Sequence, residues 1–403
     1  MKILEVCPNF GSSVASGSAK VIYDLSRKLA RRGHSVVVYT SDMEDKNTRI
    51  KKRVEEIDGV EVHRFPALGT VAARQMKLFI TPKMVRAVKY DIGSFNIVHL
   101  HEYRTLQNII IHHFAKKCGV PYVLQTHGCL PKIEPWIRLK WVYDVFFGYR
   151  LLRDASKVIA LNQVEAELYS RMGVSEAKIV VVPNGIDLSE FADLPPKGCF
   201  KKKFNIPKNK KIILYLGRIH KTKGIDLLIK AHAYMIKQMK CEDTLLVIAG
   251  PDDGYLVEAK SLVDSSGTSD SVLFTGFIDS EDKLEALVDA DLFVTPSFYG
   301  FPMTFLEACA VGTPIVTTTL EDTLDWINGN IGYVTPPTYR SLAKAAYEII
   351  SDVGLAERFS RNGRLIVKTK FSLENTVDKI ESIYREVSEP ETRWLNNTET
   401  GLS

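Results

Sequence analysis

The sequence predicts an α/β protein of two doubly wound domains that face each other across a cleft. Short apolar runs alternate with amphipathic helical patterns along the 403 residues, as in parallel strands joined by crossover helices. The alternation stops once, between about residues 188 and 211, and then restarts. A chain of this length also exceeds what one hydrophobic core ordinarily supports, so two domains are expected.

The first series opens with an apolar run at Ile3–Cys7, which is too short for a signal peptide and is typical of a buried strand. A loop rich in glycine and serine follows. A helical pattern then runs to Arg32, where Gly33 is a typical stop signal. The later apolar runs predict strands at Ser35–Thr40, Val60–Phe65, Ile97–Leu100, Tyr122–Gln125, Lys157–Ala160 and Ile179–Val182.

The second series repeats this alternation. Its apolar runs predict strands at Ile212–Leu216, Leu245–Ala249, Val272–Phe274, Leu292–Thr295 and Ile315–Thr317. Its helical patterns predict helices at Thr222–Met239, Ser280–Ala290, Met303–Val311 and Tyr339–Val353. In open parallel sheets, ligands bind beyond the carboxyl ends of the strands, so both domains are expected to present loops to the cleft.

These patterns set the expected domain boundaries. We expect one domain over residues 1–190 and a second over residues 211–371. The intervening residues 191–210 contain Pro195, Pro196 and a lysine cluster, which is the composition of a linker. A helix over 372–389 is expected to pack back onto the first domain, ahead of a polar tail at 390–403.

Composition excludes several classes of protein. Apolar residues make up 45% and charged residues 25% of the chain, as in globular proteins. No apolar stretch reaches the ~20 residues that a membrane-spanning helix needs. The six cysteines are scattered without a CxxC pair, which argues against zinc or redox chemistry and favours reduced thiols in the cytoplasm. His99, His101, His112 and His113 lack a supporting ligand spacing, so no metal site is expected.

Charge is divided unevenly between the two halves. Residues 1–190 hold 28 Lys+Arg and 19 Asp+Glu, whereas residues 191–403 hold 25 and 29. A basic first half is consistent with an anionic acceptor or a membrane surface. Nucleic acid is not expected as a partner, because no recognised binding motif accompanies the positive charge.

The segment 214–224 carries the first chemical signal. A predicted strand ends at Gly217, Arg218 follows it directly, and Lys223-Gly224 opens the next helix. An arginine fork, a lysine charge and the free N–H groups of a helix amino terminus together suit a diphosphate. On this segment alone, two solvated cations near a loop are an equally good interpretation.

The segment 295–308 carries the second signal. A predicted strand is followed by a turn through Gly300 and by a helix with Pro302 in its first turn. Glu307 lies one turn further, among apolar residues where an unpaired carboxylate would be costly. We expect it either to accept hydrogens from a sugar or to be a structural carboxylate. The backbone N–H groups expected to face an anion are those of Phe301, Met303 and Thr304.

With two more segments, these residues resemble glycosyltransferase family 4 (group 1), the retaining nucleotide-sugar transferases of the GT-B fold. Gly-Arg at 217–218 followed by Lys-Gly at 223–224 is similar to the family's signature, and 292–316 is similar to its Pro-Ser…Glu-Ala…Gly-x-Pro-Val block. Val-Pro-Asn-Gly-Ile-Asp at 182–187 and Thr-His-Gly at 126–128 complete the resemblance, which covers nearly the whole chain.

The resemblance implies a role for each matching residue. It makes the first domain the acceptor-binding domain and the second the nucleotide-sugar-binding domain. Arg218 and Lys223 would hold the diphosphate, Glu307 would accept hydrogens from the ribose, and His127 would lie beside the anomeric carbon or the outer hydroxyls of the sugar. The remaining donor-binding positions are implied at Gly17, Gly217, Ile278, Tyr299, Gly300, Phe301, Met303 and Thr304.

Two positions depart from the family's pattern. The family has paired glycines in the first-domain loop, whereas this chain has Gly17-Ser18. The family also has two glutamates seven residues apart, and here the first position holds Tyr299. Tyrosine offers a single neutral hydroxyl to the sugar, so the choice of sugar is open.

The function that follows is a retaining glycosyltransferase that moves a hexose from a nucleotide-diphosphate sugar to a sugar or lipid-linked acceptor, without a cofactor or an essential metal. The reaction would serve glycan, polysaccharide or glycolipid synthesis. The substitution at Tyr299 leaves a non-catalytic nucleotide-sugar-binding protein as the alternative. A dinucleotide oxidoreductase is set aside, because residues 11–17 lack the GxGxxG spacing.

Residues 132–153 carry aromatic residues at near-helical spacing, interleaved with arginines and lysines. This pattern fits an interfacial helix that meets a lipid-linked acceptor. It fits a helix packed within the first domain equally well. The expected location is therefore the cytoplasm, with peripheral association at the inner face of the membrane through residues 132–153 as one of the two readings.

Overall fold

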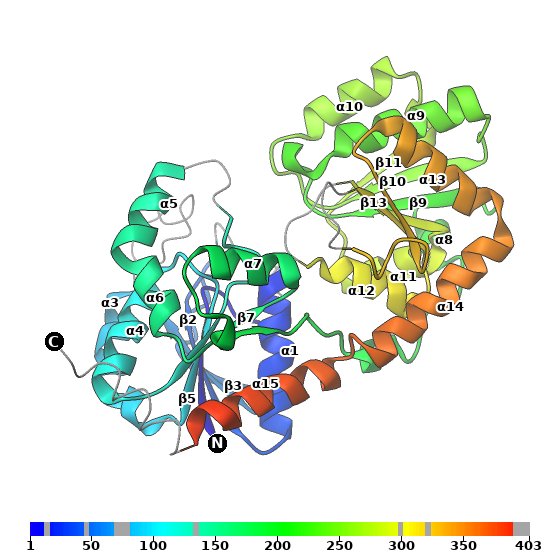
Figure 1. The fold of residues 1–403 in the computed structure, drawn as a ribbon. Helices are drawn as coiled ribbons and strands as arrows, with labels where there is room; N and C mark the ends of the chain where they lie inside the picture. The colour runs from blue at the N-terminus through cyan, green and yellow to red at the C-terminus, as the bar shows by residue number, and fades with distance from the viewer. Residues whose placement is uncertain are drawn as a thin grey trace. The chain divides into compact units, whose positions relative to one another are not determined.

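The computed structural model describes residues 1–11, 17–43, 48–67, 81–131, 137–296, 301–318 and 324–389 (Figure 1). The chain forms two compact units, each with its own parallel sheet. The first unit contains Met1–Gly185 and the C-terminal segment from Leu373, and the second contains Ile186–Ser372. The α/β class with two doubly wound domains, predicted from the sequence, is therefore confirmed.

The first unit is built on an eight-stranded sheet with the order β3-β4-β2-β1-β5-β6-β7-β8. Its parallel strands are β1 (Lys2–Val6), β2 (Ser35–Ser41), β4 (Val60–Phe65), β5 (Ile97–His101), β6 (Tyr122–Gln125), β7 (Lys157–Ala160) and β8 (Ile179–Val181). The strand order reverses at β1, which pairs with β2 on one side and β5 on the other.

One edge strand of this sheet was absent from the sequence prediction. β3 (Val54–Ile57) runs antiparallel to β4 and is joined to it by Asp58 and Gly59. Both residues have positive φ angles, 51° and 80°. A two-residue turn with this geometry matches the right-handed twist of a hairpin.

Helices cover both faces of the first sheet. One face packs against α3 (Pro82–Asp91), α4 (Leu106–Cys118), α6 (Tyr149–Asp154) and α7 (Gln163–Arg171). The other face packs against α1 (Gly17–Arg31) and α15 (Leu373–Ser388), which lie side by side (Figure 1). The end of the chain thus supplies part of the core of the first unit.

The second unit has a six-stranded parallel sheet with the order β11-β10-β9-β12-β13-β14. The strands are β9 (Lys211–Leu216), β10 (Thr244–Ala249), β11 (Val272–Gly276), β12 (Leu292–Thr295), β13 (Ile315–Thr318) and β14 (Gly332–Thr335). The order reverses at β9, between β10 and β12. The helices are α9 (Ile225–Met239), α10 (Leu256–Ser265), α11 (Ser280–Asp289), α12 (Met303–Val311), α13 (Tyr339–Ser351) and α14 (Val353–Thr369).

The segment expected as a linker, 191–210, lies inside the second unit. It contains α8 (Cys199–Lys203), whose Phe200 is fully buried in the core. The Asp289 carboxylate accepts hydrogen bonds from the backbone N–H groups of Gly198 and Lys201. A single buried aromatic ring and these bonds fix a stretch whose composition otherwise suggests a linker.

Within the described part of the chain, no helix combines the length and the apolar character needed to cross a bilayer.

Candidate functional site

The loop that follows β9 brings Gly217 and Arg218 to the carboxyl edge of the second sheet, at the point where the strand order reverses. The backbones of Gly217 and Gly250 approach so closely that a Cβ added to Gly250 would lie 2.0 Å from the Gly217 carbonyl oxygen. The Tyr215 hydroxyl donates to the Arg218 carbonyl, 3.1 Å away. The position of Arg218 is therefore fixed by close backbone packing.

Arg218 and Lys223 place two positive charges next to each other. The Arg218 guanidinium pairs with the Asp253 carboxylate at the surface. Lys223 ends a short 3₁₀ turn before α9, and burial together with the nearby charge of Arg218 lowers its pKa. No carboxylate pairs with Lys223 among the described residues. An anion bound here would compensate the buried charge of Lys223 and would offset the repulsion between Lys223 and Arg218.

The amino terminus of α12 follows the neighbouring strand, β12, and so lies along the same edge of the sheet. Its cap residue is Pro302, no described side chain caps it, and its first turn holds no acidic residue. Met303 and Thr304 form this turn, so their N–H groups have no acceptor within the helix. The ring of Phe301 stacks on Trp326, with centroids 5.8 Å apart, so its side chain belongs to the core.

Glu307, one turn into α12, is buried at 7% exposure. Its Oε1 accepts a hydrogen bond from Lys283 at 2.7 Å. Its Oε2 is buried and has no partner within the described residues. An unpaired buried carboxylate oxygen is costly, so a ligand hydroxyl at this place would stabilise it.

The remaining donor-site candidates differ in what the structure says of them. Ile278 follows β11, and its side chain packs against the core of the second unit. Gly17 opens α1 in the first unit, and a Cβ added there would meet no described atom within 4 Å. Tyr299 and Gly300 lie outside the described residues.

His127 lies in the first unit, directly beyond the carboxyl end of β6, with a φ of 51° that is unusual for a residue other than glycine. The Glu165 carboxylate holds the turn from both sides. It accepts from the Thr126 hydroxyl at 2.5 Å and from the Gly128 N–H at 2.8 Å. A strained backbone that is held this firmly indicates a functional position.

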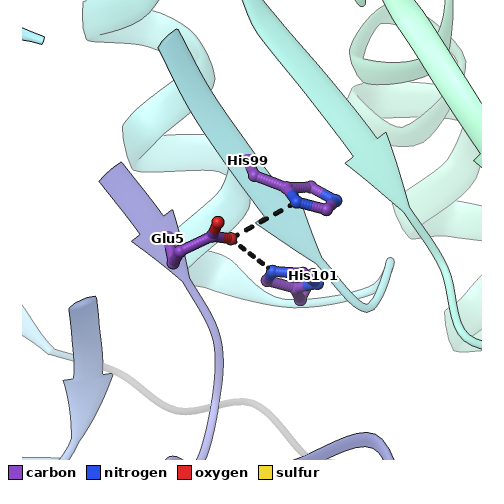
Figure 2. Close-up of side chains that lie close together, drawn as sticks. All are labelled: Glu5, His99 and His101. Atoms are coloured by element: carbon purple, nitrogen blue, oxygen red, sulfur yellow. Dashed lines mark hydrogen bonds and ion pairs between the residues drawn. The ribbon is translucent and has the colours of Figure 1, made fainter. Parts of the chain in front are cut away.

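A buried polar cluster, not expected from the sequence, lies behind His127. Glu5 of β1 faces His99 and His101 of β5, and all three side chains are fully buried (Figure 2). The Nε2 atom of His101 lies 2.6 Å from Glu5 Oε2, and its Nδ1 atom lies 2.9 Å from His127 Nε2. The ligand atoms of Glu5, His99 and His101 lie within 4.8 Å of one another, close enough to hold a metal ion.

The other two histidines considered with this pair lie outside the cluster. His112 pairs with Asp154 at 3.0 Å, and His113 packs edge-on against Phe114. The candidate residues therefore fall into two groups. Arg218, Lys223 and Glu307 belong to the second unit, whereas His127 and the cluster behind it belong to the first.

Comparison with known proteins gives a consistent result. The family model described as Glycosyltransferase Family 4 matches residues 15–190, and that described as Glycosyl transferases group 1 matches residues 197–366. An uncharacterized glycosyltransferase of Methanocaldococcus jannaschii is 26% identical over 400 residues, which cover 96% of this chain and 98% of the relative.

Two solved structures share the fold. A sucrose-phosphate synthase from Thermosynechococcus elongatus aligns with a TM-score of 0.78 and 24% identity, over 96% of this chain and 99% of that one. The Anabaena protein HepE, solved in complex with UDP and glucose, aligns with a TM-score of 0.76 and 18% identity, over 96% of this chain and 100% of that one.

Proposed function

Because the chain belongs to the group 1 glycosyltransferases of family 4, we propose that it moves a hexose from a nucleotide-diphosphate sugar to a hydroxyl acceptor with retention of configuration. The observation that carries this proposal is the unpaired Oε2 of Glu307, buried on the helix whose amino terminus lies at the same sheet edge as two cations. A nucleoside diphosphate offers ribose hydroxyls for the carboxylate and phosphates for the cations. HepE, which shares the fold, was solved with UDP bound, and this supports testing UDP-sugars first as donors.

The chemistry assigned to the second unit is electrostatic. Negative charge develops on the diphosphate as the bond to the sugar breaks, and Arg218, Lys223 and the N–H groups of α12 would stabilise it there. Fixed donors of this kind require no reorganisation during the reaction. The acceptor oxygen would enter on the face that the diphosphate leaves, so no glycosidase-like pair of carboxylates is required.

The first unit is proposed to bind the acceptor, with His127 touching the sugar. A lipid-linked acceptor is favoured by an exposed apolar surface on α5 (Ile137–Tyr143) and the π-helical turn that follows it, Asp144–Gly148. Trp141 is 55% and Phe146 63% exposed. The other exposed apolar residues of this surface are Ile137, Leu139, Val142, Val145 and Phe147, and Tyr149 at the start of α6 adjoins them.

The setting of this surface also suits a membrane. Arg138, Arg150 and Arg153 are exposed beside it, and basic residues next to apolar ones favour anionic lipid. The surface is tied to the turn that carries His127, because Arg104 bonds to the Asp144 carboxylate and to the carbonyl oxygens of Cys129 and Leu130. We propose that the protein works at the cytoplasmic face of the membrane through this surface.

Donor turnover tests the proposal. The purified chain is incubated with UDP-, GDP- and ADP-hexoses and an acceptor panel that includes lipid-linked sugars, and release of nucleoside diphosphate is followed. Transfer from one donor class with an α-configured product from an α-configured donor is the expected result. Tight binding of a nucleotide sugar with no transfer to any acceptor would favour the alternative, a nucleotide-sugar-binding protein.

A further inference from the structure

Glu5 is the charged centre of the buried cluster in the first unit. It lies on β1 opposite His99 of β5 in the register of the two parallel strands, so the two side chains share one face of the sheet. Tyr384 of α15 joins them from the helix layer. Burial by itself would raise the pKa of Glu5, but its interactions with His99 and His101 lower that pKa below its usual range, so the group is an anion.

The hydrogen bonds of this anion fix the protons of its neighbours. A carboxylate only accepts hydrogen bonds, so the two groups that hydrogen-bond to it must donate. The Tyr384 hydroxyl donates at 3.0 Å, and His101 lies 2.6 Å away through Nε2. His101 therefore carries its hydrogen on Nε2. Burial lowers the pKa of His101 to about 4, so the ring is neutral at pH 7 and its Nδ1 has a lone pair.

The same reasoning extends to the next ring. His101 Nδ1 can only accept, and its partner is His127 Nε2 at 2.9 Å. His127 must then carry its hydrogen on Nε2. Its pKa also lies well below the usual value because the ring is buried and the other two histidines are close, so His127 is neutral as well. The lone pair of His127 is thereby placed on Nδ1.

That Nδ1 atom is buried and has no partner within the described residues. The ring is held from two directions. His101 contacts it at Nε2, and Glu165 accepts hydrogen bonds from the two flanking residues, through the Thr126 hydroxyl and the Gly128 N–H. The structure thus presents one unpaired acceptor in a fixed orientation at the carboxyl edge of β6.

We propose that Glu5 and His101 are positioning residues that hold His127 as the Nε2–H tautomer, so that its Nδ1 accepts a hydrogen bond from a hydroxyl of the transferred sugar. The second half of this statement rests on the proposed function, whereas the tautomer does not. Glu5 never touches the substrate and acts through two rings.

The tautomer is measured directly on the full chain labelled with ¹⁵N-histidine. Two-bond ¹H–¹⁵N correlation spectra distinguish a protonated ring nitrogen from an unprotonated one, and the His127→Gln variant identifies the His127 signals. We expect His127 to show a protonated Nε2 and an unprotonated Nδ1 at pH 7. Protonation at Nδ1 in the wild-type protein would overturn the proposal.

Two variants at the same carboxylate separate positioning from stability. Glu5→Gln offers an amide that can donate to His101, so we expect His127 to lose its single tautomer. Tyr384→Phe removes an equally buried hydrogen bond to Glu5, and with it the 2.6 Å contact between the Tyr384 hydroxyl and His99 Nδ1, but leaves the path from Glu5 through His101 to His127 intact. We expect it to keep the wild-type spectrum. Loss of the single tautomer in both variants would mean that the cluster is only a structural network.

Kinetics test the consequence for the reaction. Glu5→Gln is expected to lower kcat by roughly 10-fold, the size of one hydrogen bond to the sugar that is lost in the transition state, with the KM for the donor unchanged. Tyr384→Phe should stay within about 3-fold of wild type on the same scale. A Glu5→Gln enzyme with wild-type kcat would contradict the positioning role. If no donor binds to the wild-type chain, the proposed function fails and the spectra alone decide the tautomer.

A metal ion at Glu5, His99 and His101 would replace this proton arrangement. Elemental analysis of the purified chain, with and without chelator, distinguishes a bound metal ion from the proposed proton arrangement. Less than stoichiometric metal and unchanged His101 signals after chelation are expected. A stoichiometric divalent ion, whose removal shifts the His99 and His101 signals, would overturn the proposed positioning of His127.

Discussion

Tyr384 of α15 donates a hydrogen bond to Glu5 of β1 at 3.0 Å, although the two residues are 379 positions apart in the sequence. The last described helix therefore supplies one of the hydrogen bonds to the buried carboxylate of the first strand. This contact joins α15 to the core that it shares with α1 and the first sheet. It also places α15 one hydrogen bond away from the path that leads to His127.

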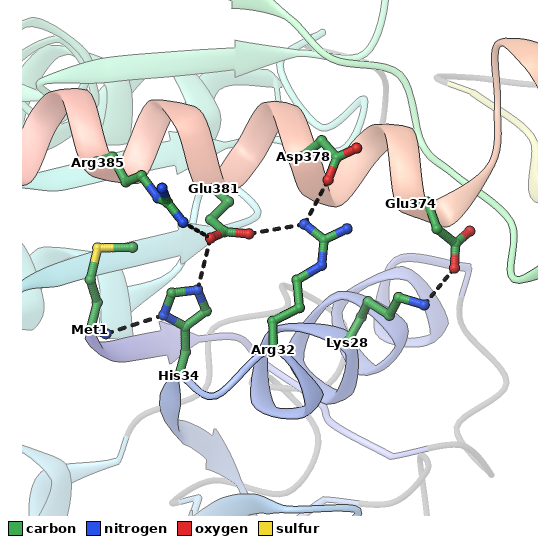
Figure 3. A network of polar contacts seen from close by, with 8 residues as sticks. All are labelled: Met1, Lys28, Arg32, His34, Glu374, Asp378, Glu381 and Arg385. Atoms are coloured by element: carbon green, nitrogen blue, oxygen red, sulfur yellow. Dashed lines mark hydrogen bonds and ion pairs between the residues drawn. The ribbon is translucent and has the colours of Figure 1, made fainter.

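The docking of α15 on α1 gives the first prediction. Glu381 lies at the centre of a polar network with Arg32, His34 and Arg385 (Figure 3). Asp378 contacts the same Arg32 but is 63% exposed at its side chain, against 12% for Glu381. We expect Glu381→Ala to lower the free energy of opening of α15, measured by hydrogen exchange, by about 1–3 kcal/mol. The matched Asp378→Ala should cost only about 0.2–1 kcal/mol.

This difference depends on pH with a definite sign. Burial would raise the pKa of Glu381, but the hydrogen bonds from Arg32 and Arg385 lower it from 4.5 to about 2. A group with a lowered folded-state pKa stabilises the fold above its unfolded value and loses that contribution as pH falls. The gap between wild type and Glu381→Ala should close between pH 4.5 and 2. A gap that is the same at both ends of this range would contradict the assignment.

The cation pair beside β9 gives the second prediction. Arg218→Ala and Lys223→Ala should each lower kcat/KM by roughly 100-fold or more, because each removes a positive charge where negative charge develops. The exposed Lys221 lies on the same 3₁₀ turn and provides the matched control. Lys221→Ala should leave kcat/KM within about 3-fold of wild type, as expected for a solvated charge. Equal losses in all three variants would point to general electrostatics instead of a diphosphate site.

Glu307 gives the third prediction. Glu307→Gln keeps the shape of the side chain but removes the charged acceptor, so binding of the nucleoside diphosphate should weaken by about 1.5–3 kcal/mol. A 2′,3′-dideoxy nucleotide, which lacks the ribose hydroxyls, should bind both forms equally weakly. Titration calorimetry with the two ligands and the two proteins forms the cycle. If Glu307→Gln still prefers the ribose ligand as strongly as wild type does, the carboxylate is structural.

The exposed surface on α5 and the following turn gives the fourth prediction. The double variant Trp141→Ser, Phe146→Ser should bind vesicles of anionic lipid roughly 100-fold more weakly, since two aromatic side chains no longer enter the bilayer interface. The double variant Val257→Ser, Leu365→Ser changes two exposed apolar residues of the second unit and should bind like wild type. Sedimentation with vesicles of phosphatidylglycerol and of phosphatidylcholine supplies the measurement. Identical vesicle binding by all three proteins would remove the membrane proposal.

Much of the fold could be predicted because buried parallel strands are continuous apolar runs. β4, β6, β7 and β12 begin and end at the predicted residues. The predicted strands omit β3 and β14, which lie at sheet edges and have partly exposed residues. The only sequence signal for β3 was the Asp58-Gly59 turn between it and β4.

The candidate site was predictable only where its residues are close in the sequence. Arg218 and Lys223 lie in one loop, so their charges could be considered together. Glu5, His101 and His127 come from three strands, and a lone glutamate inside an apolar run gives no sign of its partners. The register of β1 with β5 and of β5 with β6 reveals the path. His99 and His101 are two residues apart on β5 and therefore share one face of the strand, but nothing in the sequence points to Glu5 as their partner.

The last prediction concerns Tyr299, where the chain departs from its family and which lies outside the described residues. A glutamate at this position can accept two hydrogen bonds from neighbouring sugar hydroxyls, whereas tyrosine offers one phenolic oxygen. The cations beside β9 and Glu307 are all present, so we expect an active enzyme with an altered preference among sugars. Loss of one charged hydrogen bond should weaken discrimination between donors by about 1.5–3 kcal/mol.

Transfer rates over a panel of nucleotide hexoses are measured for wild type, Tyr299→Phe and Tyr299→Glu. An unchanged donor ranking in both variants would mean that Tyr299 does not contact the sugar. Transfer by Tyr299→Glu alone would identify the natural chain as a nucleotide-sugar-binding protein.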